Sequence, residues 1–444
     1  MCAVVGVYNT PNASKIAYYA LFAMQHRGQE ASGITSSDGE KLHTIKARGL
    51  VTDVFNEDSF DILVGDMAVG HNRYSTAGDD SILDAQPIVA KYKLGEISIV
   101  HNGNLINKEE VRQKLINEGA IFQSYMDTEN VIHLIARSQK DRLKDRIIEA
   151  LEVIKGAYCF LIQSRTKMFA IRDRYGIRPL SLGRLKDGGF IVASETCAFD
   201  LVGAEFIRDV RPGEMLIFEK DKEPTSIQLF EPQPRPCAFE YIYFARPDSV
   251  VNGKNVYETR IRMGIELASL NQVDADIVVP IPDSGVAAAL GYAKESEIPF
   301  EMGIVRNHYV GRTFIEPTQS IRDLKVKLKL SPIKEVIRGK KLIVIDDSIV
   351  RGTTSKQIVR MLREAGAKEI HMRIAAPPIK HPCKYGIDTP SYEELISANL
   401  SEEEVCKYIG ADSLAFLTID GLINSLGRDS DYSLVSFDGD YFIK

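Results

Sequence analysis

The chain has 444 residues, of which 44% are hydrophobic and 26% are charged, and its formal net charge is −6. This length and composition predict a globular protein of two or three domains and argue against an intrinsically disordered chain. The acidic balance predicts no nucleic-acid partner. No run of apolar residues reaches the length of about eighteen that a membrane span needs, and the first residues lack the regions of a secretory signal, so we expect no membrane association.

The six cysteines are scattered along the chain rather than grouped, at positions 2, 159, 197, 237, 383 and 406. Their spacing fits neither a disulfide framework nor a structural zinc site. Free thiols are typical of a reducing compartment, so the cysteine usage predicts a cytoplasmic protein.

The first half of the chain reads as short strands with a few helices. Apolar runs predict strands over residues 2–9, 67–75, 97–104, 157–164, 168–173 and 190–195. Apolar residues at helical spacing predict helices over residues 15–28, 128–139 and 143–156. Three prolines within residues 230–237 then indicate a domain junction. We expect one domain over residues 2–230 and a second over residues 237–444, the latter with a helical extension at its C-terminal end.

Strands and helices alternate in the second half. Apolar strands over residues 275–282 and 340–347 each precede a helix, over residues 285–296 and 353–366. Continuous apolar strands that alternate with helices predict an α/β domain with a parallel sheet covered on both faces.

The most specific stretch of the second half is V-I-D-D-S-I-V-R-G-T-T, residues 344–354. A buried strand runs into Asp346 and Asp347, a turn follows, and a helix begins, so backbone N–H groups and the helix dipole favour an anion there. Gly352 allows close backbone approach, and Ser348, Thr353 and Thr354 supply hydroxyl donors. The two acids suit sugar hydroxyls or Mg²⁺, so the stretch indicates a phosphorylated ribose. The alternative is an acidic cap on a surface helix.

Two further segments fit a phosphate ligand. The turn that follows residue 281 offers backbone amides to a second phosphate and comprises Pro282, Asp283, Ser284 and Gly285. Residues 306–330 are basic and aromatic with little periodicity, and they include Arg306, Arg312, Arg322, Lys325, Lys327 and Lys329. This segment is either a solvated surface or a mobile basic lid over a pyrophosphate.

The string at residues 344–354 resembles the 5-phosphoribosyl-1-pyrophosphate (PRPP) loop of the type I phosphoribosyltransferases. The resemblance implies that Asp346, Asp347 and Ser284 hold Mg²⁺. It also implies a PRPP site made of Asp283, Ser284, Arg312, Lys329, Asp346, Asp347, Ser348, Ile349, Val350, Arg351, Gly352, Thr353 and Thr354.

A cysteine directly follows the initiator methionine. If Met1 is removed, the Cys2 thiol lies beside a free α-amine with a pKa near 7.7–8.0, so one residue supplies a nucleophile and its base. The alternative is a cysteine at the start of a buried strand. In order, five other segments occur in the same half: residues 25–34, 70–78, 101–105, 124–129 and 173–183.

Together with Cys2, these segments resemble the N-terminal-nucleophile (Ntn) glutaminase domain of the class II glutamine amidotransferases, an α+β sandwich. The resemblance implies that Cys2 attacks glutamine and that Asn102 and Gly103 stabilise the oxyanion. It further implies a glutamine pocket made of Arg27, Gly28, Arg73 and Asp127, where Arg73 would bind the carboxylate and Asp127 the ammonium group. Taken alone, Arg73 also fits a surface ion pair, and Asn102 with Gly103 also fits a tight turn.

The two domain types in this order resemble the glutamine PRPP amidotransferase family. That resemblance implies glutamine and PRPP as substrates, feedback inhibition by purine nucleotides, and a homo-oligomer, either dimer or tetramer. Some members hold an iron–sulfur cluster on four cysteines. Here Cys237 and Cys383 match two ligands, but Ser433 and Ser436 stand where the other two would be, so we expect no cluster.

Two rival readings remain at the level of sequence. Glucosamine-6-phosphate synthase and asparagine synthetase share the first domain type, but they lack the loop at residues 346–354. A PRPP-sensing regulator that has lost catalysis would keep the second domain. The presence of Cys2, Arg73, Asn102 and Asp127 argues against it.

Overall fold

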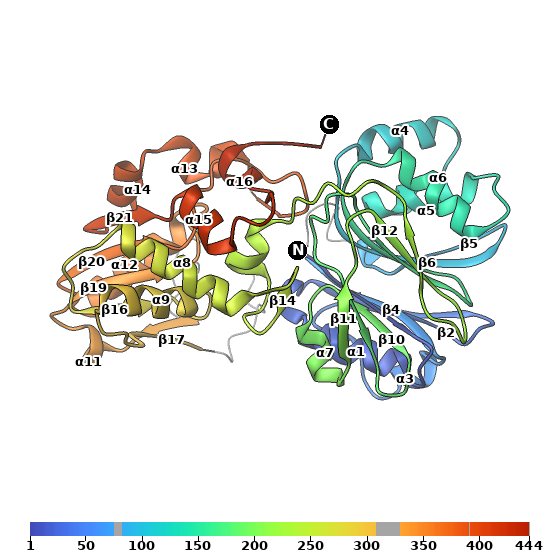
Figure 1. Cartoon of the computed structure of the whole chain (residues 1–444), viewed down its shortest axis with the longest axis horizontal. Coiled ribbons are helices and arrows are strands. Elements are labelled where there is room, and N and C mark those ends of the chain that lie inside the picture. The colour runs from blue at the N-terminus through green and yellow to red at the C-terminus, as the bar shows by residue number, and fades with distance from the viewer. Residues whose placement is uncertain (75–81, 308–328, 390, 444) are drawn as a thin grey trace.

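The computed structural model describes residues 1–74, 82–307, 329–389 and 391–443. Its two halves lie side by side, with the first half at the right of Figure 1 in blue to green and the second half at the left in yellow to red. The N-terminus lies between the two halves. A residue at the start of the chain is therefore close to the boundary between them.

The first half contains two antiparallel sheets, which have seven and six strands in the described part. The first sheet has the order β11 (Glu205–Asp209), β9 (Ser181–Arg184), β10 (Phe190–Ala193), β1 (Ala3–Tyr8), β4 (Met67–Arg73), β2 (Ala31–Ser37) and β3 (Leu42–Arg48). The second has the order β13 (Thr225–Gln228), β12 (Glu214–Phe218), β8 (Met168–Arg172), β7 (Gly156–Gln163), β6 (Gly95–Leu105) and β5 (Ile88–Tyr92).

The two sheets pack face to face, and helices cover their outer faces. Val4 and Val69 of the first sheet share a buried cluster with Val100 and Leu161 of the second. The remaining helices of this half are α1 (Ala13–Ala23), η1 (Gln25–Arg27), α2 (Val51–Val54), α3 (Ser59–Ile62), η2 (Ile82–Asp84), α4 (Lys108–Asn117), α5 (Asp127–Arg137), α6 (Leu143–Val153) and α7 (Cys197–Val202). Helices α1 and α7 pack on the first sheet, and α5 and α6 pack on the second. The predicted sandwich is confirmed.

The second half is built on a parallel sheet with the order β16 (Ile277–Pro280), β19 (Lys341–Asp346), β20 (Glu369–Ile374) and β21 (Ser413–Phe416). Successive residues of β19 point to opposite faces: Ile343 and Ile345 join one core, and Leu342 and Val344 join the other. Both faces are therefore covered, as the continuous apolar strands predict.

Short strands and helices complete this half. The strands are β14 (Val250–Val251), β15 (Lys254–Asn255), β17 (Ile304–Arg306) and β18 (Leu330–Pro332). The helices are η3 (Glu240–Phe244, a π-helix), α8 (Val256–Leu270), α9 (Val286–Ser296), α11 (Lys334–Ile337), α12 (Thr353–Glu364), η4 (Tyr392–Glu394), α13 (Ile396–Asn399), α14 (Glu402–Ile409), α15 (Ile419–Leu426) and α16 (Val435–Asp438).

The C-terminal extension was expected to be helical, and it also contains a strand. Strand β21 pairs in parallel with β20, so the extension completes the edge of the sheet. The sequence of β21, S-L-A-F, is too short to stand out as an apolar run, which is why the pattern did not predict it.

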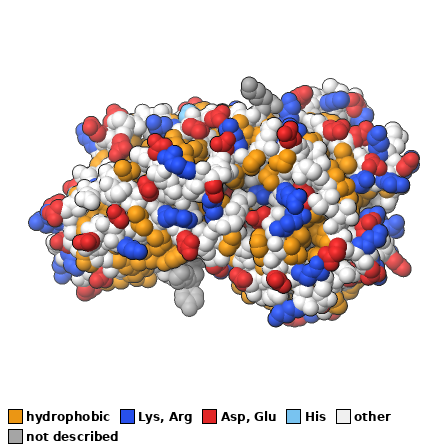
Figure 2. All heavy atoms as spheres, viewed as in Figure 1, with side chains coloured by type: hydrophobic (Ala, Val, Ile, Leu, Met, Phe, Trp, Pro, Cys, Tyr) orange, Lys and Arg blue, Asp and Glu red, His pale blue; other side chains and the backbone are white. Residues whose placement is uncertain are grey.

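On the face drawn in Figure 2, acidic and basic side chains are interspersed over both halves. Among the described residues, every helix is too short or too polar to span a membrane.

Candidate active site

Cys2 lies directly before β1, where the first sheet meets the second half. Its Sγ is 3.5 Å from the carbonyl oxygen of Tyr74, which follows the end of β4. Its own carbonyl oxygen accepts a hydrogen bond of 2.9 Å from Nε of Arg27. Burial raises the pKa of the Cys2 thiol, and the positive charges of the chain's α-amine and of Arg73 oppose that rise. The thiol is therefore buried, with the α-amine and the guanidinium of Arg73 close enough to lower its pKa.

Arg27 belongs to a buried cluster of charges at the boundary between the halves. Its Nη1 donates to Glu195 at 2.6 Å and to Glu240 at 3.0 Å, and its Nη2 donates to Glu240 at 3.1 Å. Arg178 donates to the same carboxylate of Glu240 at 3.2 Å. All four side chains are almost completely buried, and two arginines balance two glutamates. Burial alone would raise the pKa of Glu195, but His26 and Arg27 hold it well below its ordinary value.

Gly28 and Arg73 are also brought together. A Cβ on Gly28 would lie only 2.6 Å from the carbonyl carbon and oxygen of Arg73, so the close approach of the two backbones requires glycine. The Arg73 side chain is 4% exposed, and its Nη2 lies 3.8 Å from Oδ2 of Asp84. The surface ion pair that its sequence also allowed is therefore excluded.

Asn102 and Gly103 lie within β6 rather than in a turn. The Asn102 side chain is 1% exposed, and neither its Nδ2 nor its Oδ1 has a hydrogen-bond partner among the described residues. A Cβ on Gly103 would lie 2.0 Å from the carbonyl oxygen of Ala157, so no other residue fits there. Buried polar groups are normally paired, so a free amide indicates a group kept for a ligand.

Asp127 is the first residue of α5 and is buried. Its Oδ2 accepts from the backbone N–H of Leu105 at 2.8 Å, and its Oδ1 lies 3.4 Å from Nδ1 of His101. Burial opposes its ionisation, but His101 and the Leu105 N–H lower the pKa of the carboxyl below its ordinary value. Asp127 therefore carries a negative charge and can accept hydrogen bonds from the ammonium group of a ligand. The sequence did not indicate that His101 would be its neighbour.

A hydrogen bond between two histidines joins β4, which leads to Tyr74 beside Cys2, to β6, which carries Asn102 and Gly103. His71 of β4 makes a 3.1 Å hydrogen bond from Nε2 to the carbonyl oxygen of His101 on β6. Burial lowers the pKa of His71 to about 3, so its ring is neutral and donates this bond. The contact fixes the end of β4 against the strand that carries Asn102.

A cavity of about 640 Å³ opens at the carboxyl end of β19. Almost all of the residues expected to bind PRPP line it: Asp283, Ser284, Lys329, Asp346, Asp347, Ser348, Ile349, Val350, Arg351, Gly352, Thr353 and Thr354. Arg312, with Arg322, Lys325 and Lys327, lies outside the described residues. Arg306 lines the cavity and forms a 2.6 Å ion pair with Asp283.

Two helices, α9 and α12, begin at this cavity, so their N-termini face it. Gly352, with a φ of 73°, precedes α12, and Gly285 precedes α9. The backbone N–H groups and the dipole at a helix N-terminus favour a phosphate. Arg351 forms an ion pair of 3.0 Å with Glu394 at the rim, and both side chains are half exposed.

Asp346 and Asp347 are each 8% exposed, and no ion pair joins them to another described residue. Burial, followed by the charge of Asp347, raises the pKa of Asp346 well above its ordinary value. Two adjacent buried carboxylates suit a hard divalent ion such as Mg²⁺, whose other ligands are normally water and phosphate oxygens. The described residues contain no group of three His, Cys, Asp or Glu side chains that could hold a metal.

Sequence reasoning missed part of both sites. Tyr74 lines the cavity, and its carbonyl oxygen also faces Cys2. Tyr243 and Phe244 of η3 form an aromatic wall, and Asp388 and Thr389 form another edge. Tyr74 directly follows Arg73 and could have been found from that position. The others come from distant segments without a phosphate-binding pattern.

The four residues at the positions of the cluster ligands in some family members lie close together. They are Cys237, Cys383, Ser433 and Ser436. Cys237 and Ser433 form an isolated parallel β-bridge, and burial raises the pKa of Cys237 to about 11. The hydroxyls of Ser433 and Ser436 are buried and have no partner in the part of the chain that is described. Two thiols, from Cys237 and Cys383, and two hydroxyls do not fit a cubane cluster, which takes four thiolates.

Comparisons with known proteins match both halves. The family model for the glutamine amidotransferase domain matches residues 71–200, and that for the phosphoribosyl transferase domain matches residues 257–396. Amidophosphoribosyltransferase 1 of Arabidopsis thaliana, a chloroplastic protein, is 53% identical over 100% of this chain and 79% of its own length. Amidophosphoribosyltransferase of Bacillus subtilis is 47% identical over 99% of this chain and 94% of its own.

A solved structure agrees with these relatives. The B. subtilis glutamine PRPP amidotransferase in complex with ADP and GMP superposes with a TM-score of 0.95 at 46% identity, covering 100% of this chain and 98% of that one. Similarity over the full length, in sequence and in fold, confirms the resemblance that the motifs indicated. The chain belongs to the amidophosphoribosyltransferase family.

Proposed function

We propose that Cys2 and the cavity at the end of β19 carry out the two halves of the family's reaction. In that reaction, the first step of purine biosynthesis, glutamine, PRPP and water give 5-phosphoribosylamine, glutamate and pyrophosphate. One observation carries the proposal. Tyr74 contacts the Cys2 thiol through its carbonyl oxygen and also lines the phosphoribosyl cavity, so the two sites adjoin.

In the first half-reaction, the α-amine of Cys2, free once Met1 is removed, takes the thiol proton. The thiolate attacks the side-chain amide carbon of glutamine, and a C–S bond forms as the carbonyl π electrons move to oxygen. The oxyanion collapses to a thioester, the C–N bond breaks, and ammonia leaves with the proton returned from the amine. Water then hydrolyses the thioester to glutamate and regenerates the thiol.

The surrounding groups support these roles. The free Asn102 amide and the Gly103 N–H are donors suited to the oxyanion. The guanidinium of Arg73 suits the glutamine carboxylate, and the charged carboxylate of Asp127 suits its ammonium group. Arg27 and Gly28 fix the positions of Cys2 and Arg73.

In the second half-reaction, neutral ammonia attacks C1 of the ribose, and the C1–O bond to pyrophosphate breaks. The N-termini of α9 and α12 suit the two phosphate groups, and Asp346 and Asp347 suit the ribose hydroxyls. Mg²⁺ held by Asp346, Asp347 and Ser284 would neutralise charge on the leaving pyrophosphate.

We assign the first half-reaction to a glutaminase domain, residues 2–230, and the second to a phosphoribosyltransferase domain, residues 237–444. The B. subtilis neighbour was solved with ADP and GMP, which supports purine nucleotides as inhibitors of this chain too. We further propose a cytoplasmic homo-oligomer without a cluster. The plant relatives are named chloroplastic, so location is a property to be measured.

The test compares wild-type protein with Cys2→Ala in two assays, glutamate release from glutamine and phosphoribosylamine formation from PRPP with ammonium. We expect Cys2→Ala to lose the first activity and to keep the second, because the phosphoribosyl cavity is untouched. Cys406→Ala, which removes another free thiol far along the chain, is the matched control and should keep both. A PRPP-binding regulator would show neither activity in wild-type protein.

A further inference from the structure

We infer that the segment over residues 384–389 is a positioning element for Gly103 and links that residue to the occupation of the phosphoribosyl cavity. The inference rests on the proposed function, in which the Gly103 N–H stabilises the oxyanion. None of residues 384–389 belongs to the expected glutamine or PRPP site. The segment lies 281 residues or more beyond Gly103 in sequence, yet it touches the same strand.

Three hydrogen bonds fasten the segment to the first half of the chain. Nδ2 of Asn104, the residue after Gly103, donates to the carbonyl oxygen of Lys384 at 2.9 Å. Arg178 donates from Nε at 3.0 Å and from Nη2 at 2.6 Å to the carbonyl oxygen of Tyr385. Arg178 is fully buried and also holds Glu240, so this attachment is part of the charge cluster that reaches Arg27.

The next residue lies against Gly103 itself. Gly386 has a φ of 100°, and a Cβ built there would lie 2.9 Å from the carbonyl carbon of Gly103 and 3.1 Å from its Cα and oxygen. The two backbones therefore touch with no side chain between them. Because an oxyanion donor must stand at a defined distance from the developing charge, a small displacement of Gly103 weakens that contact.

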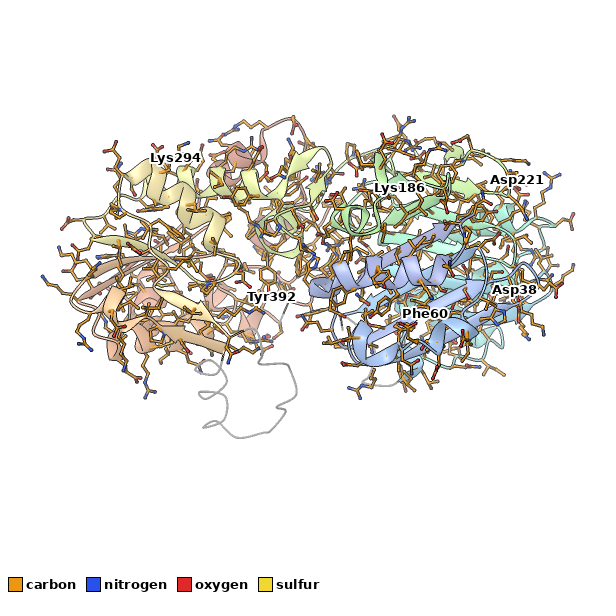
Figure 3. The ribbon with its side chains drawn as sticks, turned by 90° about the horizontal axis from the view of Figure 1, so that it is seen from below. Asp38, Phe60, Lys186, Asp221, Lys294 and Tyr392 are labelled. Atoms are coloured by element: carbon orange, nitrogen blue, oxygen red, sulfur yellow. The ribbon has the colours of Figure 1, made fainter. Side chains whose placement is uncertain are left out.

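The other end of the segment forms part of the cavity. Ile387, Asp388 and Thr389 line it, together with the phosphate-binding turn at the end of β19. Oγ1 of Thr389 accepts from the backbone N–H of Cys383 at 2.5 Å, which closes the segment into a compact turn. Tyr392, just beyond, lies at the boundary between the halves in Figure 3, away from Lys294 in the second half and Asp38 in the first.

These contacts define a short physical link. A ligand that presses on Asp388 or Thr389 would shift a closed turn that also contains Gly386, and Gly386 is in backbone contact with Gly103. We infer that PRPP in the cavity sets the Gly103 N–H in its productive position, so that glutamine is cleaved when its ammonia can be used.

The experiment uses the full-length protein and the variant Asn104→Asp. The new carboxylate has the shape of the amide, but it places an oxygen opposite the carbonyl oxygen of Lys384, so the contact becomes repulsive. The matched control is Asn107→Asp, because Asn107 donates in the same way to a carbonyl oxygen, that of Val153 at 3.0 Å, within the first half. Glutamate release is measured with and without PRPP, and phosphoribosylamine formation is measured with ammonium.

We expect PRPP to stimulate glutamate release in wild type and Asn107→Asp, and the stimulation factor to fall by about fivefold or more in Asn104→Asp. The KM for glutamine and the ammonium-dependent activity should stay within about twofold, because neither pocket is altered. A purely structural defect would lower the ammonium-dependent activity as well.

A second pair of variants tests the glycine contact. Gly386→Ala should lower the glutamine-dependent kcat by about tenfold or more, again with the ammonium-dependent rate kept. Gly188→Ala is its control, since Gly188 has a similar φ of 92° but open space around it. The inference is overturned if Asn104→Asp keeps the stimulation factor of Asn107→Asp, or if wild type releases glutamate from glutamine at the same rate with and without PRPP. Wild-type protein that releases no glutamate at all would instead overturn the proposed function.

Discussion

At the scale of single residues, Asn102 is a buried side chain whose amide has no partner among the described residues. We expect Asn102→Ala to lower kcat for glutamate release by about 10²–10³-fold, because one oxyanion donor is lost, and to leave the KM for glutamine nearly unchanged. Steady-state glutamate release measures both constants.

The matched control for this prediction is Asn72→Ala. Asn72 is equally buried, but it donates to the carbonyl oxygen of Leu21 at 2.8 Å and accepts from Ser32 at 3.0 Å. Its loss leaves those groups unpaired, so Asn72→Ala should lower the thermal unfolding midpoint more than Asn102→Ala does. The opposite order of the two midpoints would contradict the assignment of Asn102 as a group kept for a ligand.

The α-amine next to Cys2 sets the expected pH dependence. In the structure the amine of Met1 is buried, and burial, with the charges of Arg27 and Arg178, lowers its pKa to about 5. Once Met1 is removed, the Cys2 amine lies one residue further on, still beside Arg27, which binds the Cys2 carbonyl.

An amine must be neutral to take the thiol proton, so activity falls as the pH drops through its pKa. A lowered pKa moves that fall to lower pH. We therefore expect the acid limb of kcat/KM for glutamine to lie below the ordinary value of about 7.7 for an α-amine. A pH profile of glutamate release, on protein whose intact mass shows loss of Met1, checks this, and a limb at or above pH 8 would contradict it.

At the scale of elements, the π-helix η3 joins the two sites. Its first residue, Glu240, binds Arg27 and Arg178, while Tyr243 and Phe244 line the cavity. Glu240→Gln would leave two buried guanidinium groups with only one carboxylate. We expect the free energy of unfolding to fall by about 3–5 kcal/mol, and glutamate release to fall because Arg27 no longer holds Cys2 firmly.

Chemical denaturation compares Glu240→Gln with Glu223→Gln. Glu223 pairs with Arg184 at 2.7 Å, but its side chain is 72% exposed, so its loss should cost less than about 1 kcal/mol. If both substitutions lowered the free energy of unfolding equally, the buried cluster would stabilise the fold no more than an exposed ion pair does.

Structure formed by neighbouring residues could be predicted from the sequence, whereas contacts between distant residues could not. The strand, turn and helix around Asp346 are contiguous, so the pattern gave both the local fold and the cavity residues. Strand β2, A-S-G-I-T-S-S, was missed because small polar residues do not resemble a buried strand. They are needed there, since a Cβ on Gly33 would lie 2.3 Å from the carbonyl oxygen of Gln86.

Long-range partners escaped prediction for a related reason. Glu195, Arg178 and Glu240 are ordinary charged residues in sequence, and only folding brings them together around Arg27. Lys384 and Gly386 meet β6 across the boundary between the halves. Motifs identify the residues that chemistry requires, whereas the residues that position them depend on the whole fold.

At the scale of the whole molecule, the shared residue Tyr74 places the thiol beside the phosphoribosyl cavity. Ammonia must be neutral to attack C1 of the ribose, and in neutral water it is mostly protonated. With PRPP bound, we expect ammonia to pass between the sites without mixing with the solvent. An ammonia-consuming enzyme, glutamate dehydrogenase with NADH and 2-oxoglutarate, should then capture less than about a tenth of the glutamine nitrogen.

The control is Cys2→Ala supplied with ammonium, for which the same trap must abolish phosphoribosylamine formation, because that ammonia comes from solution. If the trap captures most of the nitrogen released by wild-type protein with PRPP bound, the two sites exchange through water. The contacts of Tyr74, Glu240 and Gly386 across the boundary would then serve stability alone, since a coupled glutaminase gains nothing when its product escapes.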